Sequence, residues 1–451
     1  MHTKSKKTLL FALFLLVLLH SAVNAQNQCV DVFPYELDVG IYWLSMRIIP
    51  DLAADNSTDI ESFNGINYAF HWQKSCNGSI AVAFDVAKPI LLITHGLQPN
   101  MVIARERLHT TPDFEKLLIM WVLRGWNVGV FEYTQIADES IANFYRKESN
   151  IYNCNTYRHI EYKHIDPVTG ELHISDVPGC PTITELYVAH YALHMAHRQQ
   201  AYNGSAPPVQ VHIVGHSLGG QLVINSAHTI LLNPGLQEVT HVTALDMVMS
   251  PGRKEYIPQN IYDCYEIPEL MGFLVSDLRA SDTCDVDVWR GSFINKCLFS
   301  SENYARLVRN CIFVTLLLFE DGDQSIGSCF DTEMLTSPAK FVDTLKSMAV
   351  QTYNQHINTL IYYFKTASLP PQLCKRTEEY ACRPIADEPP ITAYMPQKTL
   401  HALMINNTDK NGGRLCYRQY DDGTRTAASP TMNYDPSDDL FFKLPCVTVN
   451  T

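Results

Sequence analysis

Between residues 79 and 245 the chain alternates short apolar runs with longer segments of helical periodicity, and this alternation restricts the fold more than any other feature. Such a rhythm is typical of parallel strands joined by crossover helices. We predict strands at 79–86, 89–94, 126–133, 209–214 and 239–245. We predict the intervening helices at 114–123, 182–199 and 217–232. The expected fold is therefore α/β, with a mostly parallel central sheet flanked by helices.

Residues 1–25 have the pattern of a secretory signal peptide. Three lysines precede an apolar run over residues 9–19, and the segment ends on a small-x-small sequence at residues 23–25. The run is too short to cross a bilayer core, which needs about 20 apolar residues, and no later run is longer. We expect a secreted, extracellular protein with no transmembrane segment.

The composition agrees with export. Thirteen cysteines favour structural disulfides in an oxidising compartment. Four Asn-x-Ser/Thr sequences predict surface loops that can carry glycans, and they begin at Asn56, Asn77, Asn203 and Asn406. A formal net charge of −13 argues against a nucleic-acid partner.

Two segments interrupt the alternation of strands and helices. Residues 135–181 contain Cys154 and Cys180, so we expect a disulfide-stapled surface insertion, and residues 247–340 form a second long insertion. We expect one α/β domain over residues 26–370. Residues 371–451 form a C-terminal extension braced by cysteines, which lacks a run of regular strands and suggests no chemistry.

The segment Gly215-His216-Ser217-Leu218-Gly219-Gly220 follows a predicted strand and precedes a predicted helix. In Gly-x-Ser-x-Gly the serine occupies a sharp turn, and the glycines remove side chains that would collide there. The helix N-terminus would bring the Leu218 amide to the place where an oxyanion forms. The pattern predicts a nucleophilic Ser217. The alternative is a Gly-rich turn with an incidental serine.

This segment resembles the serine segment of α/β-hydrolases, and specifically of pancreatic-lipase-like enzymes, over roughly residues 80–370. The His95-Gly96 pair at the exit of a predicted strand resembles the lipase oxyanion loop. That resemblance implies that Leu97 contributes the second oxyanion amide. The alternative is an ordinary strand-to-loop turn.

A serine nucleophile needs a general base, and the base needs a carboxylate that fixes its tautomer. In α/β-hydrolases these follow in the order serine, acid, histidine. Asp246 ends the next predicted strand and resembles the acid of pancreatic-type lipases, although Met247 stands where those enzymes have proline. The alternatives are Asp321 and Asp323, which follow a predicted strand over 311–319.

The chain order leaves His356 and His401 as candidates for the base. His356 precedes the pair Tyr362-Tyr363 by six and seven residues, as in pancreatic-type lipases, whereas His401 has no such neighbours. We therefore assign the base to His356. The alternative is a histidine on a packed helix.

Residues 265–280 form an amphipathic helical pattern between the acid and the base. Cys264 and Cys284 flank it. In pancreatic-type lipases such a segment is the lid that opens at a lipid surface, so the resemblance implies a lid over residues 264–284. The alternative is an ordinary surface helix packed on the core.

Two other clusters could bind metal. His190, His194 and His197 recur at helical spacing, but the His-Glu-x-x-His form is absent, which favours a partly exposed polar stripe. The acidic sequence at residues 320–323 lacks a full calcium loop. We expect no metal and no cofactor.

The resemblance implies a secreted serine hydrolase that cleaves carboxylic esters, chiefly of lipids, at a lipid–water interface. Ser217 attacks, His356 relays the proton and Asp246 orients His356. The Leu218 and Leu97 amides stabilise the oxyanion. The alternative function is a catalytically silent hydrolase fold retained as a secreted binding protein.

Overall fold

A computed structural model describes seventeen segments of the chain. These are 32–49, 60–63, 66–75, 80–110, 114–140, 143–154, 159–250, 253–257, 266–281, 283–291, 313–316, 356–368, 372–378, 381–384, 392–395, 415–419 and 440–445. The predicted signal peptide (1–25), the alternative acids Asp321 and Asp323, and His401 lie outside the described residues. So do Cys264 and the glycan acceptors Asn56, Asn77 and Asn406.

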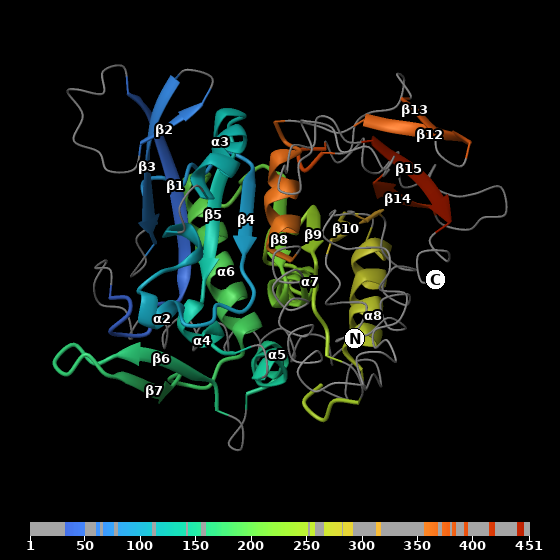
Figure 1. Cartoon of the computed structure of the whole chain (residues 1–451). Helices are drawn as coiled ribbons and strands as arrows, with labels where there is room; N and C mark the ends of the chain where they lie inside the picture. The colour runs from blue at the N-terminus through green and yellow to red at the C-terminus, as the bar shows by residue number, and fades with distance from the viewer. Residues whose placement is uncertain are drawn as a thin grey trace, which may run out of the picture. The chain divides into compact units, whose positions relative to one another are not determined.

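The chain divides into two compact units. The first comprises residues 1–213 and 229–238, and the second comprises 214–228 and 239–451. Both are mixed α/β, and most of the elements are labelled in Figure 1. Within the described residues of both units, no helix combines the length and apolarity that a membrane span requires.

The first unit is built on a sheet whose strand order is β8-β4-β5-β1-β3-β2. Its strands are β1 (Gly40–Ile49), β2 (Ile60–Phe63), β3 (Ile66–Lys74), β4 (Ile90–Thr94), β5 (Asn127–Glu132) and the start of β8 (Val211–His216). Strands β4 and β5 run parallel and are buried along their whole length, which explains their continuous apolar runs. Strands β1, β3 and β2 are antiparallel additions at the end of this order.

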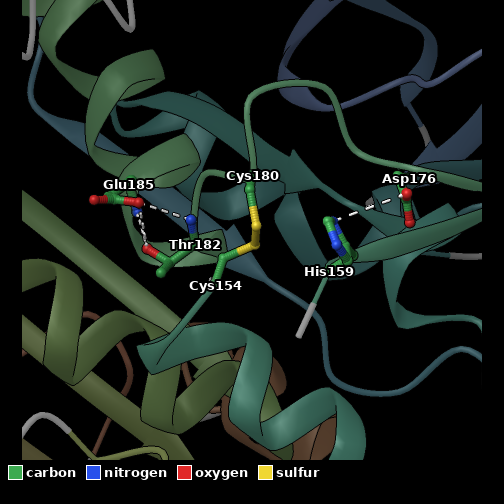
Figure 2. Close-up of a disulfide and its surroundings, with 6 residues drawn as sticks. All are labelled: Cys154, His159, Asp176, Cys180, Thr182 and Glu185. Carbon is green, nitrogen blue, oxygen red and sulfur yellow. Dashed lines mark hydrogen bonds and ion pairs between the residues drawn. A yellow bond between two sulfur atoms is a disulfide. The ribbon is translucent and has the colours of Figure 1, made fainter. Parts of the chain in front are cut away.

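Helices of the first unit follow the predicted pattern. The predicted helices over 114–123 and 182–199 are α3 (Phe114–Leu123) and α6 (Ile183–Ala201). Thr182 caps α6, because its hydroxyl accepts from the Glu185 N–H while the Glu185 carboxylate accepts from the Thr182 N–H (Figure 2). The unit also contains three short helical turns, α2 (Met101–Ala104), η2 (Leu108–Thr110) and α4 (Thr134–Ala137).

The segment predicted as an insertion at 135–181 has its own secondary structure. It contains α5 (Phe144–Tyr152) and an antiparallel hairpin of β6 (Glu161–Ile165) and β7 (Leu172–Asp176), a separate two-stranded sheet. A disulfide joins Cys154, just after α5, to Cys180, two residues before the α6 cap (Figure 2). The disulfide therefore fixes both ends of the hairpin segment. The helix α5 is largely buried, so this segment is not merely a surface insertion.

The second unit has the strand order β13-β12-β15-β14-β11-β10-β9-β8. Its strands are the end of β8, β9 (His241–Leu245), β10 (Asp285–Arg290), β11 (Phe313–Leu316), β12 (Gln372–Glu378), β13 (Ala381–Pro384), β14 (Leu415–Gln419) and β15 (Leu440–Pro445). Strands β9, β10, β11 and β14 run parallel. The helices are α7 (Leu218–Leu231), of which residues 229–231 fall in the first unit, α8 (Ile267–Ala280) and the helical residues 356–365, drawn as the orange helix in Figure 1.

Three sequence predictions need correction. Residues 80–86 form turns instead of a strand, because the side chains of Gln73 and Asn127 bind the N–H groups of Ala83 and Asp85. Residues 247–340 contain β10 and β11, so this segment supplies strands of the sheet. The C-terminal residues 371–451 contribute β12 to β15, although the sequence suggested no run of regular strands. Short strands in polar segments give little periodicity, and partners from elsewhere in the chain stabilise them.

The predicted amphipathic helix at 265–280 is α8. The apolar side chains of its predicted face are buried, whereas Phe273 on the helix is exposed, and the helix contacts β10. Because α8 lies in the connection between the parallel neighbours β9 and β10, it occupies the position of a crossover helix. This is the packing that the alternative interpretation predicts. The lid remains a prediction.

Candidate active site

Ser217 follows β8 directly and has a left-handed backbone conformation, with φ of 58°. Such a conformation costs free energy for any residue with a Cβ, so the surrounding structure must hold it. The Ser217 N–H donates to the Leu245 carbonyl at 2.9 Å. A Cβ at Gly215 would lie 2.1 Å from the Gly219 carbonyl oxygen, so glycine is required there. These features are those of a sharp strand-to-helix turn.

Asp246 follows the neighbouring strand β9 and also has a left-handed conformation, with φ of 42°. Its N–H donates to the Trp289 carbonyl at 2.6 Å, which ties the turn to β10. The side chain is fully buried. The Gly291 N–H donates to Oδ1 at 3.2 Å, and the His356 imidazole occupies Oδ2. The buried carboxylate is thus stabilised by a backbone donor and an imidazole donor.

His356 begins the described helical residues 356–365 and is buried. Its Nδ1 lies 2.5 Å from Oδ2 of Asp246. Because the carboxylate accepts, Nδ1 carries the hydrogen, and Nε2 of a neutral imidazole is then left as a proton acceptor. The His356 carbonyl oxygen lies 2.8 Å from Nε2 of His216, the residue before Ser217.

A buried polar network lies between β9, β10 and the helix that begins at His356. Oδ1 of Asp287 accepts from the Thr243 hydroxyl at 2.5 Å, and its Oδ2 accepts from the Trp289 indole at 2.6 Å. The Thr243 hydroxyl also lies 3.1 Å from the Tyr363 hydroxyl. Burial and the Asp287 carboxylate raise the pKa of Tyr363 well above its usual value, so this phenol stays neutral. The network attaches the His356 helix to the sheet two turns beyond His356.

Four of the predicted site residues belong to the second unit, and contacts within it connect them. Ser217 is bound through its amide to the residue before Asp246, and Asp246 is bound to His356. Leu218 is the first residue of α7. The fifth residue, Leu97, belongs to the first unit, so its proposed role as an oxyanion donor remains a prediction.

The loop that carries Leu97 is well supported inside the first unit. The Tyr133 hydroxyl donates to the His95 carbonyl at 2.7 Å, and the two rings stack at 4.3 Å. Nδ1 of His95 donates to the Gly96 carbonyl at 2.8 Å. This carbonyl belongs to the same planar peptide as the Leu97 N–H, so the imidazole also sets the direction of that N–H.

Sequence reasoning missed the supporting residues His216, Gly291, Asp287 and Tyr133. For His216 a signal existed, since it occupies the variable position before the serine in the motif. Gly291 and Asp287 come from β10 and the residue after it, and no local pattern connects them to Asp246. Only the pairing of β9 with β10 brings them together.

Two of the three predicted α6 histidines do not belong to a partly exposed stripe, whereas His197 is partly exposed as predicted. His190 and His194 are buried. The Trp43 indole donates to Nε2 of His194 at 2.7 Å, and Nδ1 of His194 donates to the His190 carbonyl at 2.7 Å. Both ring nitrogens of His194 therefore already have protein partners. Within the described residues, no three His, Cys, Asp or Glu side chains are grouped to hold a metal ion.

Comparisons with known proteins give distant likenesses. No protein-family model matches the chain, and no curated protein sequence matches it. A lipase/esterase from Lactobacillus plantarum is 11% identical with a TM-score of 0.30, and the likeness covers 68% of this chain and 99% of that one. A lipase-esterase related protein from Clostridium acetobutylicum is 13% identical with a TM-score of 0.26, over 58% and 96% of the two chains.

A peroxisomal alpha-beta-hydrolase from Saccharomyces cerevisiae is 10% identical with a TM-score of 0.27, over 61% of this chain and 81% of that one. At such scores the likenesses carry no argument about this chain.

Proposed function

We propose that this chain is an α/β-hydrolase, similar to the pancreatic-type lipases, that cleaves carboxylic esters through Ser217, His356 and Asp246. The Ser217 hydroxyl attacks the ester carbonyl and gives its proton to Nε2 of His356. His356 then donates that proton to the departing alcohol as the carbon–oxygen bond breaks. Water, deprotonated by His356, attacks the acyl-enzyme, releases the carboxylic acid and restores the Ser217 hydroxyl.

One observation carries the proposal. The 2.5 Å contact between Nδ1 of His356 and Oδ2 of Asp246 fixes the tautomer that a general base needs. It occurs in the same unit as Ser217, whose left-handed turn is joined by a hydrogen bond to the residue before that acid. The strained serine turn and the carboxylate–imidazole pair support the proposal, because nucleophilic catalysis needs an activated serine, a base and a group that orients the base.

The oxyanion of the tetrahedral intermediate needs two hydrogen-bond donors. The Leu218 amide is suited to this role, because it opens α7, where the helix dipole favours negative charge. We assign the second donor to the Leu97 amide, on the resemblance of His95-Gly96-Leu97 to the lipase oxyanion loop.

The substrate we propose is a lipid ester met at a lipid–water interface. This assignment depends on the resemblance to pancreatic-type lipases and on a lid over residues 264–284. Secretion is proposed from the signal-peptide pattern at residues 1–25. If α8 acts only as a crossover helix, the same catalytic residues suit a smaller, soluble ester.

The experiment that tests the proposal is covalent labelling of the secreted protein with a serine-reactive alkyl phosphonate. We expect the parent chain to take up one label and Ser217→Ala to take up none. Ser226→Ala is a matched control, because Ser226 is buried in the same helix nine residues further on. If the parent chain takes no label, the silent binding protein becomes the better interpretation.

A further inference from the structure

His216 contacts the proposed base in two ways. Its Nε2 lies 2.8 Å from the main-chain oxygen of His356. The centroids of the two imidazole rings are 4.3 Å apart, with 40° between their planes. Both side chains are buried, and both residues belong to the second unit.

The chemistry of this contact fixes its direction. A peptide carbonyl oxygen only accepts hydrogen bonds, so Nε2 of His216 carries the hydrogen and donates it. His216 is the last residue of β8, and the next residue is Ser217. The hydrogen bond therefore joins the backbone of the base to the strand end that carries the nucleophile, across 140 residues of chain.

Two contacts then hold His356 from different sides. Asp246 holds the Nδ1 edge of the ring, and His216 holds the main chain and packs against the ring at a tilt. A bond at Nδ1 alone lets the ring pivot about the carboxylate. With the backbone held as well, the direction of Nε2 is restricted, and Nε2 is the atom that must meet the serine hydroxyl.

We propose that His216 is a positioning residue for the hydrolysis. It holds His356 so that Nε2 is directed toward the Ser217 hydroxyl. This inference rests on the proposed function. A position that only stabilised the fold would tolerate any buried ring of similar size. A positioning role instead requires a hydrogen-bond donor at the place of Nε2.

Two substitutions separate these requirements. His216→Phe keeps a planar ring and loses the donor, whereas His216→Gln loses the ring and keeps an N–H donor near the same place. With a short-chain 4-nitrophenyl ester, we expect His216→Phe to lower kcat about 10- to 100-fold. We expect KM to stay within about twofold, because the contact acts on the base and not on the bound ester. On a logarithmic scale, we expect the kcat of His216→Gln to lie about halfway or more from the value of His216→Phe back to that of the parent.

The matched control is His212→Phe, a buried histidine four residues earlier in β8 that lies in the first unit and outside the proposed site. We expect this variant to keep the parent's kcat at a temperature where it is folded. Thermal melting of all variants checks folding. If His216→Phe does not fold, His216→Gln is compared with His216→Asn. The shorter Asn amide cannot reach the His356 carbonyl. In that comparison kcat must fall only in the Asn variant.

The outcomes separate this inference from the proposed function. If the parent chain takes no phosphonate label at Ser217, the proposed function fails and this inference fails with it. If the parent is labelled and His216→Phe is labelled at the same rate, only the positioning role is overturned. Equal kcat values for His216→Phe and the parent, or for the Gln and Asn variants, would overturn it as well.

Discussion

Nδ1 of His356 lies 2.5 Å from Oδ2 of Asp246, and the two residues are separated by 110 positions in the chain. Two backbone groups hold Asp246 in place. Its N–H donates to the Trp289 carbonyl of β10, and its Oδ1 accepts from the N–H of Gly291, the residue after β10. The backbone therefore positions the carboxylate independently of the imidazole. Because the Asp246 side chain is already held, its bond to His356 fixes the Nδ1–H tautomer without a further loss of Asp246 side-chain entropy.

Replacement of this acid tests its role directly. Asp246→Asn removes the charge and offers an amide N–H to Nδ1, which favours the wrong tautomer, so kcat should fall by about 10³- to 10⁴-fold. The measurement is steady-state hydrolysis of a short-chain ester. Asp176→Asn on the exposed strand β7 is a control of the same chemistry in the first unit, and its kcat should stay near that of the parent. A large loss of kcat in Asp323→Asn with little loss in Asp246→Asn would show that Asp323 is the catalytic acid.

The glycine after the motif is required by close packing. A Cβ at Gly220 would lie 2.9 Å from the Cβ of Met247, and neither atom can swing away as the end of a flexible side chain can. We expect Gly220→Ala to shift the first turn of α7, to cost about 1–3 kcal/mol of stability and to lower kcat. Gly235→Ala is the matched control, because a Cβ there meets nothing nearer than 3.5 Å. Urea unfolding and ester hydrolysis measure the two effects, and equal stability of the two variants would contradict the packing argument.

The Tyr363 hydroxyl contributes to the anchor of the His356 helix. Tyr363→Phe removes one of the hydrogen-bond partners of Thr243 and should cost about 1–2 kcal/mol in the free energy of unfolding. Tyr145→Phe is the control, because the Tyr145 side chain is 52% exposed and water can hydrogen-bond to its hydroxyl. Urea titrations measure both. Since the pKa of Tyr363 lies well above 10, the difference between Tyr363→Phe and the parent should not change between pH 6 and 9.

The buried histidine His194 predicts how stability depends on pH. Burial lowers its pKa from 6.5 to about 4, because the charged ring would lose hydration and could no longer accept from Trp43. The unfolded chain therefore binds a proton first as the pH falls. Stability from this residue is complete above about pH 6.5 and is lost as the pH falls toward 4.

The corresponding variant is His194→Gln, which keeps an acceptor for Trp43 and does not titrate. Between pH 7 and 4.5 we expect the parent to lose about 2 kcal/mol more stability than this variant. His173→Gln, on the exposed strand β7, is the control and should follow the parent. Urea unfolding at the two pH values measures the difference. Parallel losses in the parent and in His194→Gln would show that His194 is not responsible.

Local features of the site could be predicted from the sequence because their causes are local. The turn at Ser217 needs glycines two residues before and after it, and these are neighbours in the chain. The strands and helices around it, such as β4, α3 and α7, also carry their pattern within their own residues. The choice of Asp246 and His356 needed a family resemblance in addition, because chain order alone left alternatives open.

Features that depend on partners far away in the chain could not be predicted from the sequence. The strands β1 to β3 and β12 to β15 have weak patterns and exist because neighbouring strands satisfy their backbone groups. The apolar face of α8 predicted a helix but could not say what it packs against, and the structure supplies β10.

The amino-acid sequence is thus sufficient to predict a sharp serine turn in an α/β fold and a short set of candidate partners for that serine. The folded chain shows in addition that Asp246 and His356 meet, that Gly291 and Trp289 hold the acid, and that His216 holds the backbone of His356. The two kinds of feature differ in the range of the interactions that produce them. Backbone conformation is set by adjacent residues, whereas hydrogen bonds between residues more than a hundred positions apart exist only after the parallel strands have aligned their ends.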